Sequence, residues 1–254
     1  MRRPPQHPVL PRLTSADSDV VFGLFRNDGR PVAAGVHAVL GTPITAPPAA
    51  GQAEALFGCG CFWGAEKGFW RLPGVVTTAV GYAGGASPAP TYQQVCSGTT
   101  GHAEVVRVVW DERQVHFSDL LKLFWECHDP TQGDRQGNDR GSQYRSCIFV
   151  DDPELLQLAL ASRDHYQHQL AEAGFAAITT EIRGDVPFFA AEDYHQQYLA
   201  KPGSRPYCSA QPSGVRLAPF AGAAFRLDPR VWQAYDWSIA HCVLRGDNAP
   251  IRLS

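Results

Sequence analysis

Residues 54–64 read Glu-Ala-Leu-Phe-Gly-Cys-Gly-Cys-Phe-Trp-Gly, and the fold can be worked out from this stretch. Its first half is apolar and predicts a strand, and a helix follows directly. Cys61 is therefore expected at the start of a helix, where unpaired N–H groups and the positive end of the helix dipole favour the thiolate. The alternative is that Cys61 is a small buried side chain, as most free cysteines are.

The order Gly60-Cys61-Phe62-Trp63-Gly64 closely resembles the signature of the methionine sulfoxide reductase A family. The resemblance extends from about Ala55 to about Cys208, well over half of the chain. Each further matching stretch is weak evidence by itself, but their order and spacing together are highly specific. The stretches lie at 81–85, 91–96, 100–104, 124–133, 136–139, 143–146 and 191–199.

Composition excludes several classes of protein. The chain has 254 residues, 44% of them hydrophobic, which allows one sizeable core with appendages. A net charge of −3 gives no reason to expect nucleic acid or an acidic membrane surface as a partner. No apolar run is long enough for a signal peptide or a membrane span. Seven cysteines, at irregular spacing, favour reduced thiols, so we expect a cytoplasmic protein. We also expect a monomer.

The chain divides into an arm, a catalytic domain, a tail and an extension. Eight of the twenty prolines lie in residues 1–50, which predicts an arm with a hairpin over 20–34. Residues 51–200 are interpreted as the catalytic domain and 201–216 as a flexible tail. Residues 217–254 match nothing in the family, and either pack onto the domain or bind a partner.

Within the domain, alternating strand and helix patterns predict an α+β fold. Strands are expected at 54–57, 75–82, 104–110, 144–150 and 178–182, and helices through 66–70, from Ser118 or Asp119, over 153–174 and over 190–199. This order predicts a two-layer sandwich with a mixed sheet, and the resemblance implies a ferredoxin-related fold. Gly-rich loops at 83–103 and 129–142 are expected to carry sites.

The resemblance implies a reaction at Cys61, the reduction of methionine S-sulfoxide in peptides or proteins. The thiol would attack the substrate sulfur and end as a sulfenic acid. Glu104 would be the acid, kept protonated by burial, although a lone glutamate is more often solvated. Tyr92 and Tyr144 match family tyrosines that hydrogen-bond the sulfoxide oxygen, while the simpler interpretation of each is packing.

The resemblance also assigns substrate-binding residues. Phe62 and Trp63 would enclose the S-methyl group of the substrate, a role compatible with packing at a helix start. Asp139 matches a residue that holds the substrate's polar backbone, although Asn138 and Asp139 after a glycine are also typical of a turn.

Recycling requires a second thiol, and Cys208 in the tail is the candidate. The resemblance implies a Cys61–Cys208 disulfide reopened by thioredoxin. The family has Gly-Tyr before this cysteine, whereas this chain has Pro206-Tyr207, and a third relay cysteine is expected only if Cys242 serves. No cofactor is expected. A metal site of Cys61 with Cys127, His128 and Asp129 is rejected, because adjacent residues do not easily converge on one ion.

Two other functions remain open at this point. A cysteine hydrolase or acyltransferase would use His102 as the base for Cys61. A binding module that lost its chemistry would keep the fold alone. The remaining cysteines are interpreted as structural, and the remaining histidines as scaffolding for the Gly-rich loops. They are Cys59, Cys96, Cys127 and Cys147, and His102, His128 and His195.

Overall fold

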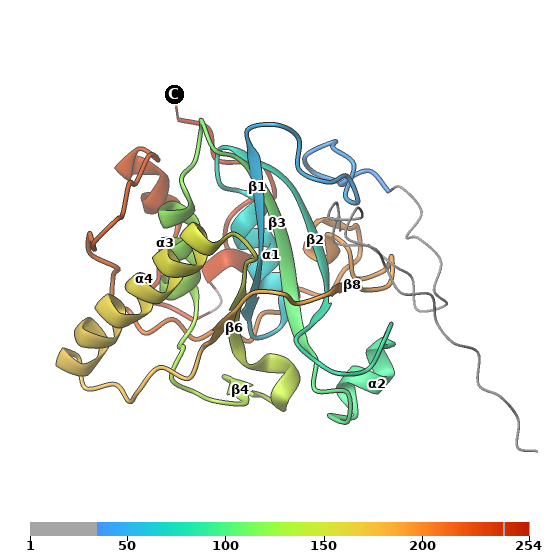
Figure 1. Ribbon diagram of the computed structural model, residues 1–254. Helices are drawn as coiled ribbons and strands as arrows, with labels where there is room; N and C mark the ends of the chain where they lie inside the picture. The colour runs from blue at the N-terminus through green and yellow to red at the C-terminus, as the bar shows by residue number, and fades with distance from the viewer. Residues whose placement is uncertain (1–34, 241, 254) are drawn as a thin grey trace, which may run out of the picture.

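A six-stranded sheet forms the centre of the molecule in the computed structural model, which describes residues 35–240 and 242–253 (Figure 1). The strands follow the order β7-β6-β1-β3-β2-β8 across it. They are β1 (Gln52–Cys59), β2 (Val75–Ala83), β3 (Ala103–Asp111), β6 (Ser146–Phe149), β7 (Glu181–Arg183) and β8 (Phe188–Ala190). The predicted hairpin over 20–34 lies outside the described residues.

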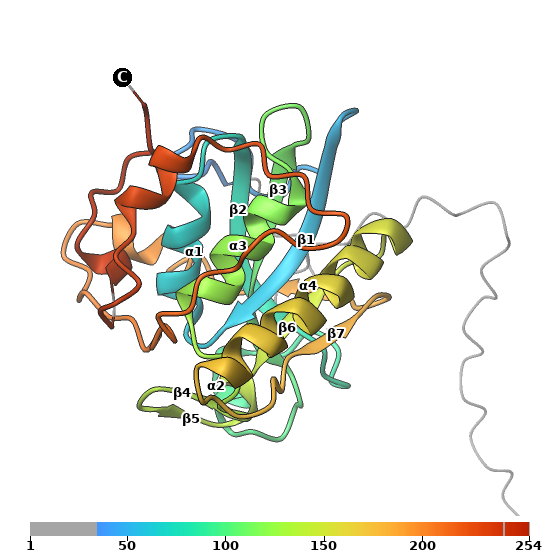
Figure 2. The same ribbon diagram turned by 90° about the vertical axis from the view of Figure 1, so that its left-hand side faces the viewer.

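Four α-helices and several shorter elements complete the fold. The α-helices are α1 (Phe62–Trp70), α2 (Tyr92–Cys96), α3 (Phe117–Cys127) and α4 (Pro153–Glu172). The 3-10 turns are η1 (Ser142–Tyr144), η2 (Tyr198–Ala200), η3 (Pro229–Ala234) and η4 (Cys242–Leu244), and a small ladder joins β4 (Arg135–Gln136) to β5 (Asp139–Arg140). α1, α3 and α4 all contribute side chains to one apolar core against the same face of the sheet. Figure 2 shows α1 and α3 side by side.

The sheet is mixed, as the sequence predicts. β1 pairs antiparallel with β3 and β6, β2 pairs antiparallel with β3 and β8, and only β7 runs parallel to its neighbour β6. Aromatic side chains fill the layer between sheet and helices, with Phe57 stacked on Phe69 at 4.7 Å between ring centres. The α+β expectation is confirmed, and the ferredoxin-related detail is compatible with this topology.

The predicted helix over 190–199 is wrong. The chain instead ends β8 at Ala190 and passes through turns to η2. Polar side chains take the place of helical hydrogen bonds here. The Gln196 amide pairs with both backbone groups of Val80, at 2.9 Å each, and Gln197 donates its backbone N–H and its amide to buried Glu66. Gln197 adopts a left-handed backbone, φ 46°, that a helix does not allow.

Smaller differences concern element ends. Tyr144 lies in η1 instead of a strand, since β6 begins at Ser146, and the strand expected at 178–182 is β7, Glu181–Arg183. α3 is capped by His116, not by Ser118 or Asp119; Asp119 completes the cap by accepting the backbone N–H of His116 at 3.1 Å. The loop at 83–103 contains α2, which Thr91 begins with a capping box.

The segments at either end of the domain pack against it. The ring of His37 bonds Thr78 of β2 at 2.8 Å, and Arg107 of β3 donates to the carbonyls of Ile44 and Ala46. The C-terminal extension buries Trp232, Tyr235 and Trp237 among other apolar side chains, so its described residues pack onto the domain. Within 35–240 and 242–253 no helix is long and apolar enough to cross a membrane.

Candidate active site

Cys61 occupies the N-cap position of α1, directly after β1, as the sequence predicts. Gly60 makes the turn between them with a left-handed backbone, φ 88°, and a Cβ there would collide with Gln136. Gly60 thereby sets the direction in which the chain enters the helix. The backbone N–H of Cys61 donates to Ser209 of the tail at 3.3 Å.

Glu104 lies at the edge of the same site, on β3. Its carboxyl is buried, and its Oε2 accepts the backbone N–H of Phe62 at 3.0 Å. Burial raises the pKa of Glu104 to about 8, an effect that the Phe62 hydrogen bond opposes and the charge of Asp139 reinforces. A carboxyl with this pKa is mostly protonated at neutral pH, in agreement with the expectation.

The Cys61 thiol is not acidic in this arrangement. Its pKa is raised well above the ordinary value, first by burial and then by the charge of Glu104, while the Trp63 backbone N–H acts in the opposite direction. The sequence predicts that the helix N-terminus favours the thiolate of Cys61, and in this structure burial of the sulfur acts more strongly in the opposite direction.

Two tyrosines approach the carboxyl from separate elements. Tyr92 is the first residue of α2 and Tyr144 the last of η1, and both are half-buried. Burial raises the pKa of each phenol, and the charge of Glu104 raises it further, as does the Cys96 hydrogen bond at Tyr92. Both phenols thus remain protonated donors beside Glu104.

An aromatic wall borders the thiol. Phe62 and Trp63 follow Cys61 in α1, and the Trp63 indole stacks on Tyr198 with 3.9 Å between ring centres. His195, expected as loop scaffolding, lies against this wall instead: its Nδ1 accepts the Trp63 indole N–H at 3.2 Å, and its ring meets Tyr92 at 4.6 Å. Its pKa is lowered to about 4 by burial, so the ring is neutral.

Asp139 and Tyr207 close the other side of the site. The Tyr207 hydroxyl donates to the Asp139 carboxylate, and the Tyr207 ring meets Trp63 edge-on at 6.3 Å. The sequence predicts no role at the site for Tyr207 or Tyr198, and only loop scaffolding for His195, although all three stand in or beside the stretches that match the family. Aromatic side chains inside a motif of otherwise polar residues are the signal that would have found them.

Cys208 is buried one helical turn from Cys61. It packs on α1 at Gly64, where any side chain would collide with its sulfur. Gly64 is three residues beyond Cys61, about one helical turn, so Cys208 packs on the face of α1 from which Cys61 projects. Burial raises the pKa of Cys208 to about 12. The next tail residues are held in place, since the backbone N–H of Gln211 donates to Gln136 at 3.0 Å.

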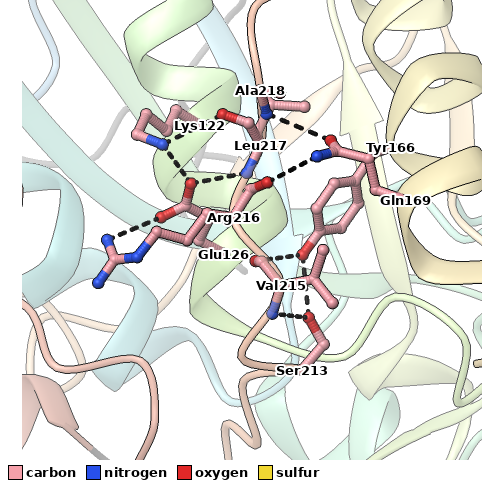
Figure 3. Close-up of polar contacts among 9 residues, drawn as sticks. All are labelled: Lys122, Glu126, Tyr166, Gln169, Ser213, Val215, Arg216, Leu217 and Ala218. Carbon is pink, nitrogen blue, oxygen red and sulfur yellow. Dashed lines mark hydrogen bonds and ion pairs between the residues drawn. The ribbon is translucent and has the colours of Figure 1, made fainter. Parts of the chain in front are cut away.

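The tail is also attached further along, to α3 and α4 (Figure 3). The buried carboxylate of Glu126 accepts the backbone N–H of Leu217 at 2.8 Å and pairs with Lys122. On the neighbouring helix, the Tyr166 hydroxyl donates to the Val215 carbonyl at 2.9 Å. Cys208 therefore lies in a loop fastened on both sides, and the expected flexible tail, 201–216, is bonded to the domain over its last residues.

The histidine proposed as a hydrolase base is occupied elsewhere. His102 accepts the backbone N–H of Gly85 at Nδ1, 3.1 Å, and its Nε2 lies 2.7 Å from the Ser87 carbonyl. It holds the Gly-rich loop, as expected of loop scaffolding. With both nitrogens used in this way, His102 cannot serve Cys61 as a base.

Comparisons with known proteins agree with this geometry. Residues 53–220 match the family model for peptide methionine sulfoxide reductase, and the chain belongs to that family. Peptide methionine sulfoxide reductase MsrA of Azotobacter vinelandii is 57% identical over 195 residues, which are 76% of this chain and 89% of the relative. MsrA of Methylococcus capsulatus is 56% identical over 76% of this chain and 86% of the relative.

A solved structure agrees as well. Methionine sulfoxide reductase A of Corynebacterium diphtheriae, 45% identical, has a TM-score of 0.66 and covers 81% of this chain and 97% of its own. The family model ends at residue 220, so most of the C-terminal extension lies outside it.

Proposed function

We propose that this protein reduces methionine S-sulfoxide, free or in peptides and proteins, to methionine. The observation that carries the proposal is the Cys61 thiol at a helix N-terminus beside the buried, protonated Glu104, in a chain that belongs to the peptide methionine sulfoxide reductase family. A soft thiol attacks sulfur, and a protonated carboxyl stabilises the oxygen that leaves it.

In the first step the Cys61 sulfur bonds to the sulfoxide and takes its oxygen. Cys61 becomes a sulfenic acid and methionine is released; the proton lost by the thiol is balanced by the one gained at oxygen. Glu104, Tyr92 and Tyr144 donate hydrogen bonds to that oxygen as charge develops on it. The raised pKa of Cys61 means that most enzyme waits as the thiol, and ionises only as substrate binds.

Substrate recognition is assigned to the walls of the site. Phe62 and Trp63 enclose the S-methyl group, and Asp139 accepts hydrogen bonds from the substrate's backbone. In the structure Tyr207 occupies the Asp139 carboxylate, so this phenol must move or share that carboxylate when a peptide binds. The aromatic and polar sides together distinguish one sulfoxide epimer from the other.

Recycling uses Cys208. Its thiol attacks the Cys61 sulfenic acid, water leaves, and a Cys61–Cys208 disulfide remains. Thioredoxin, a dithiol protein, reopens this bond by exchange and becomes the disulfide. We place the protein in the cytoplasm, as a monomer that repairs oxidised proteins; the support for the compartment is the odd number and irregular spacing of the seven cysteines, which favour reduced thiols.

The test is NADPH consumption coupled to thioredoxin and its reductase, with the S and R epimers of a methionine sulfoxide peptide supplied separately. We expect activity with the S epimer only. Equal use of both epimers, or of neither, contradicts the proposal. A hydrolase or acyltransferase would leave an acyl-enzyme and consume no NADPH, and a binding module would do neither.

A further inference from the structure

Three buried thiols surround one small cavity behind α1. Cys59 comes from the end of β1, Cys127 from the end of α3, and Cys208 from the tail. All three are nearly inaccessible to solvent. The cavity has a volume of only about 10 Å³, far below that of a ligand site, so the thiols face one another and not a bound molecule.

Cys59 and Cys127 are close enough to act as a pair. Their sulfur atoms and a ring nitrogen of His128 all lie within 4.8 Å of one another. A disulfide needs the two sulfurs at about 2 Å, so the pair has to close from this separation when it is oxidised. The two positions come from different elements, so the pair exists only in the folded protein.

The same cluster is poorly suited to a metal ion. His128 directs Nδ1 to the Phe124 carbonyl at 2.7 Å and Nε2 to the Ser146 hydroxyl at 2.8 Å, so neither nitrogen is free to bind an ion. Cys208 lines the cavity but is not part of the group of ligand atoms within 4.8 Å of one another, so without His128 only two thiols remain, and two ligands do not make a closed zinc site. Redox chemistry between the thiols fits the cluster better.

Cys208 connects this pair with the reacting thiol. It contacts α1 at Gly64, one turn from Cys61, and it lines the cavity that Cys127 and Cys59 also line. A thiol between two partners can pass a disulfide from one to the other by exchange.

We propose that Cys59 and Cys127 are a second redox pair, which receives the disulfide of Cys61–Cys208 through Cys208. Cys127 attacks the Cys208 sulfur, a Cys127–Cys208 bond forms, and Cys61 leaves as a thiol. Cys59 then attacks the Cys127 sulfur and Cys208 leaves. Two thiols are oxidised and two are reduced, with no net change in protons.

The electrostatics of the pair set the order of attack. The Cys59 thiol hydrogen-bonds the Cys127 sulfur and thereby lowers its pKa, and neighbouring His128 adds to this. Burial raises the pKa of Cys59, which stays protonated until Cys127 has been oxidised. Cys127 is therefore the first nucleophile, and Cys59 closes the pair.

The proposal rests on the sulfoxide reduction described above, and it predicts a stoichiometry. Fully reduced enzyme, freed of reductant and kept under argon, is mixed with excess methionine S-sulfoxide peptide, and the methionine formed per enzyme is counted. We expect about two equivalents from the wild type, and about one from Cys59→Ser or Cys127→Ser. Cys147→Ala, a buried thiol on β6 that does not line the cavity, is the matched control and should retain two.

Thermal unfolding of each variant checks that it folds, and peptide mapping of the spent wild type under non-reducing conditions provides a readout without mutation. It should show a Cys59–Cys127 bridge beside Cys61–Cys208. A wild type that stops at one equivalent overturns the second pair while leaving the reductase intact, whereas no equivalent at all contradicts the reductase itself. Two equivalents that depend on Cys242, with no Cys59–Cys127 bridge, also overturn it.

Discussion

Oε2 of Glu104 accepts the backbone N–H of Phe62 at 3.0 Å, and Phe62 is the residue next to Cys61. The proposed acid, Glu104, and the proposed nucleophile, Cys61, are thereby held at a set separation by the first turn of α1. One oxygen of Glu104 accepts this bond, which leaves the other oxygen to carry the proton toward the site.

Replacement of Glu104 tests whether hydrogen bonding to the sulfoxide oxygen suffices. In Glu104→Gln the amide oxygen still accepts the Phe62 N–H, and the amide N–H₂ still donates. We expect this variant to keep the single-turnover rate within about tenfold at neutral pH, and Glu104→Ala to lose about 10² or more. Rates of methionine formation over a pH series measure both. A glutamine variant no faster than alanine would make proton transfer itself the essential step.

Glu104 should also make stability depend on pH. Its folded pKa, about 8, exceeds its ordinary value of 4.5, so between these values the folded state holds a proton that the unfolded state has lost. Stability is then fully present below about 4.5 and declines as pH rises toward 8, by roughly 1.4 kcal/mol per pH unit for one such group.

Urea unfolding from pH 5 to 8 measures that slope. Glu104→Gln has no proton to lose at this position and should reduce the slope, most clearly between pH 7 and 8, since buried Glu66, with a pKa of about 7, adds a slope of the same sign below that. Glu172→Gln, at an exposed position on α4, should leave the slope unchanged. Parallel curves for Glu104→Gln and wild type would mean that this carboxyl is already ionised in the folded state.

Removal of the Cys208 thiol separates chemistry from recycling. Cys208→Ser should still reduce about one equivalent of sulfoxide, because attack by Cys61 comes first. Turnover with thioredoxin should collapse, and dithiothreitol should restore it by reaching the sulfenic acid directly. Disulfide mapping of oxidised wild type completes the test. A dominant Cys61–Cys242 bridge would assign recycling to the C-terminal extension; the Cys242 side chain lies outside the described part of the structure.

Glu126 should be a major anchor of the tail. Its buried carboxylate accepts the Leu217 N–H and pairs with Lys122, and burial raises its pKa. Glu126→Ala removes the acceptor of the Leu217 N–H and the partner of the Lys122 ammonium, which should lower the free energy of unfolding by about 3–5 kcal/mol. Glu172→Ala, exposed on α4, is the control and should change it by less than about 0.5 kcal/mol. Equal effects in denaturant titrations would show that the tail is held by its apolar contacts alone.

Local patterns predicted most of the sheet and three of the helices correctly. The strand before Cys61, the helix after it and the Asp152-Pro153 start of α4 are signals within a few residues, where periodicity and capping act directly. The prediction of a helix over 190–199 was wrong because buried Glu66, far away in sequence, accepts the Gln197 backbone N–H that a helix would use, together with the Gln197 side-chain amide.

The sequence by itself determined the family to which the chain belongs and pointed to the candidate reacting groups, because both depend on residue order in short motifs. Only the tertiary structure decided the protonation of these groups and which side chains surround them. Packing of distant segments buries Cys61 and thereby raises its pKa. The same packing places His195 and Tyr207 beside Trp63. The fold also brings Cys59, Cys127 and Cys208 to one cavity, although Cys59 and Cys127 are 68 residues apart along the chain and Cys127 and Cys208 are 81 apart.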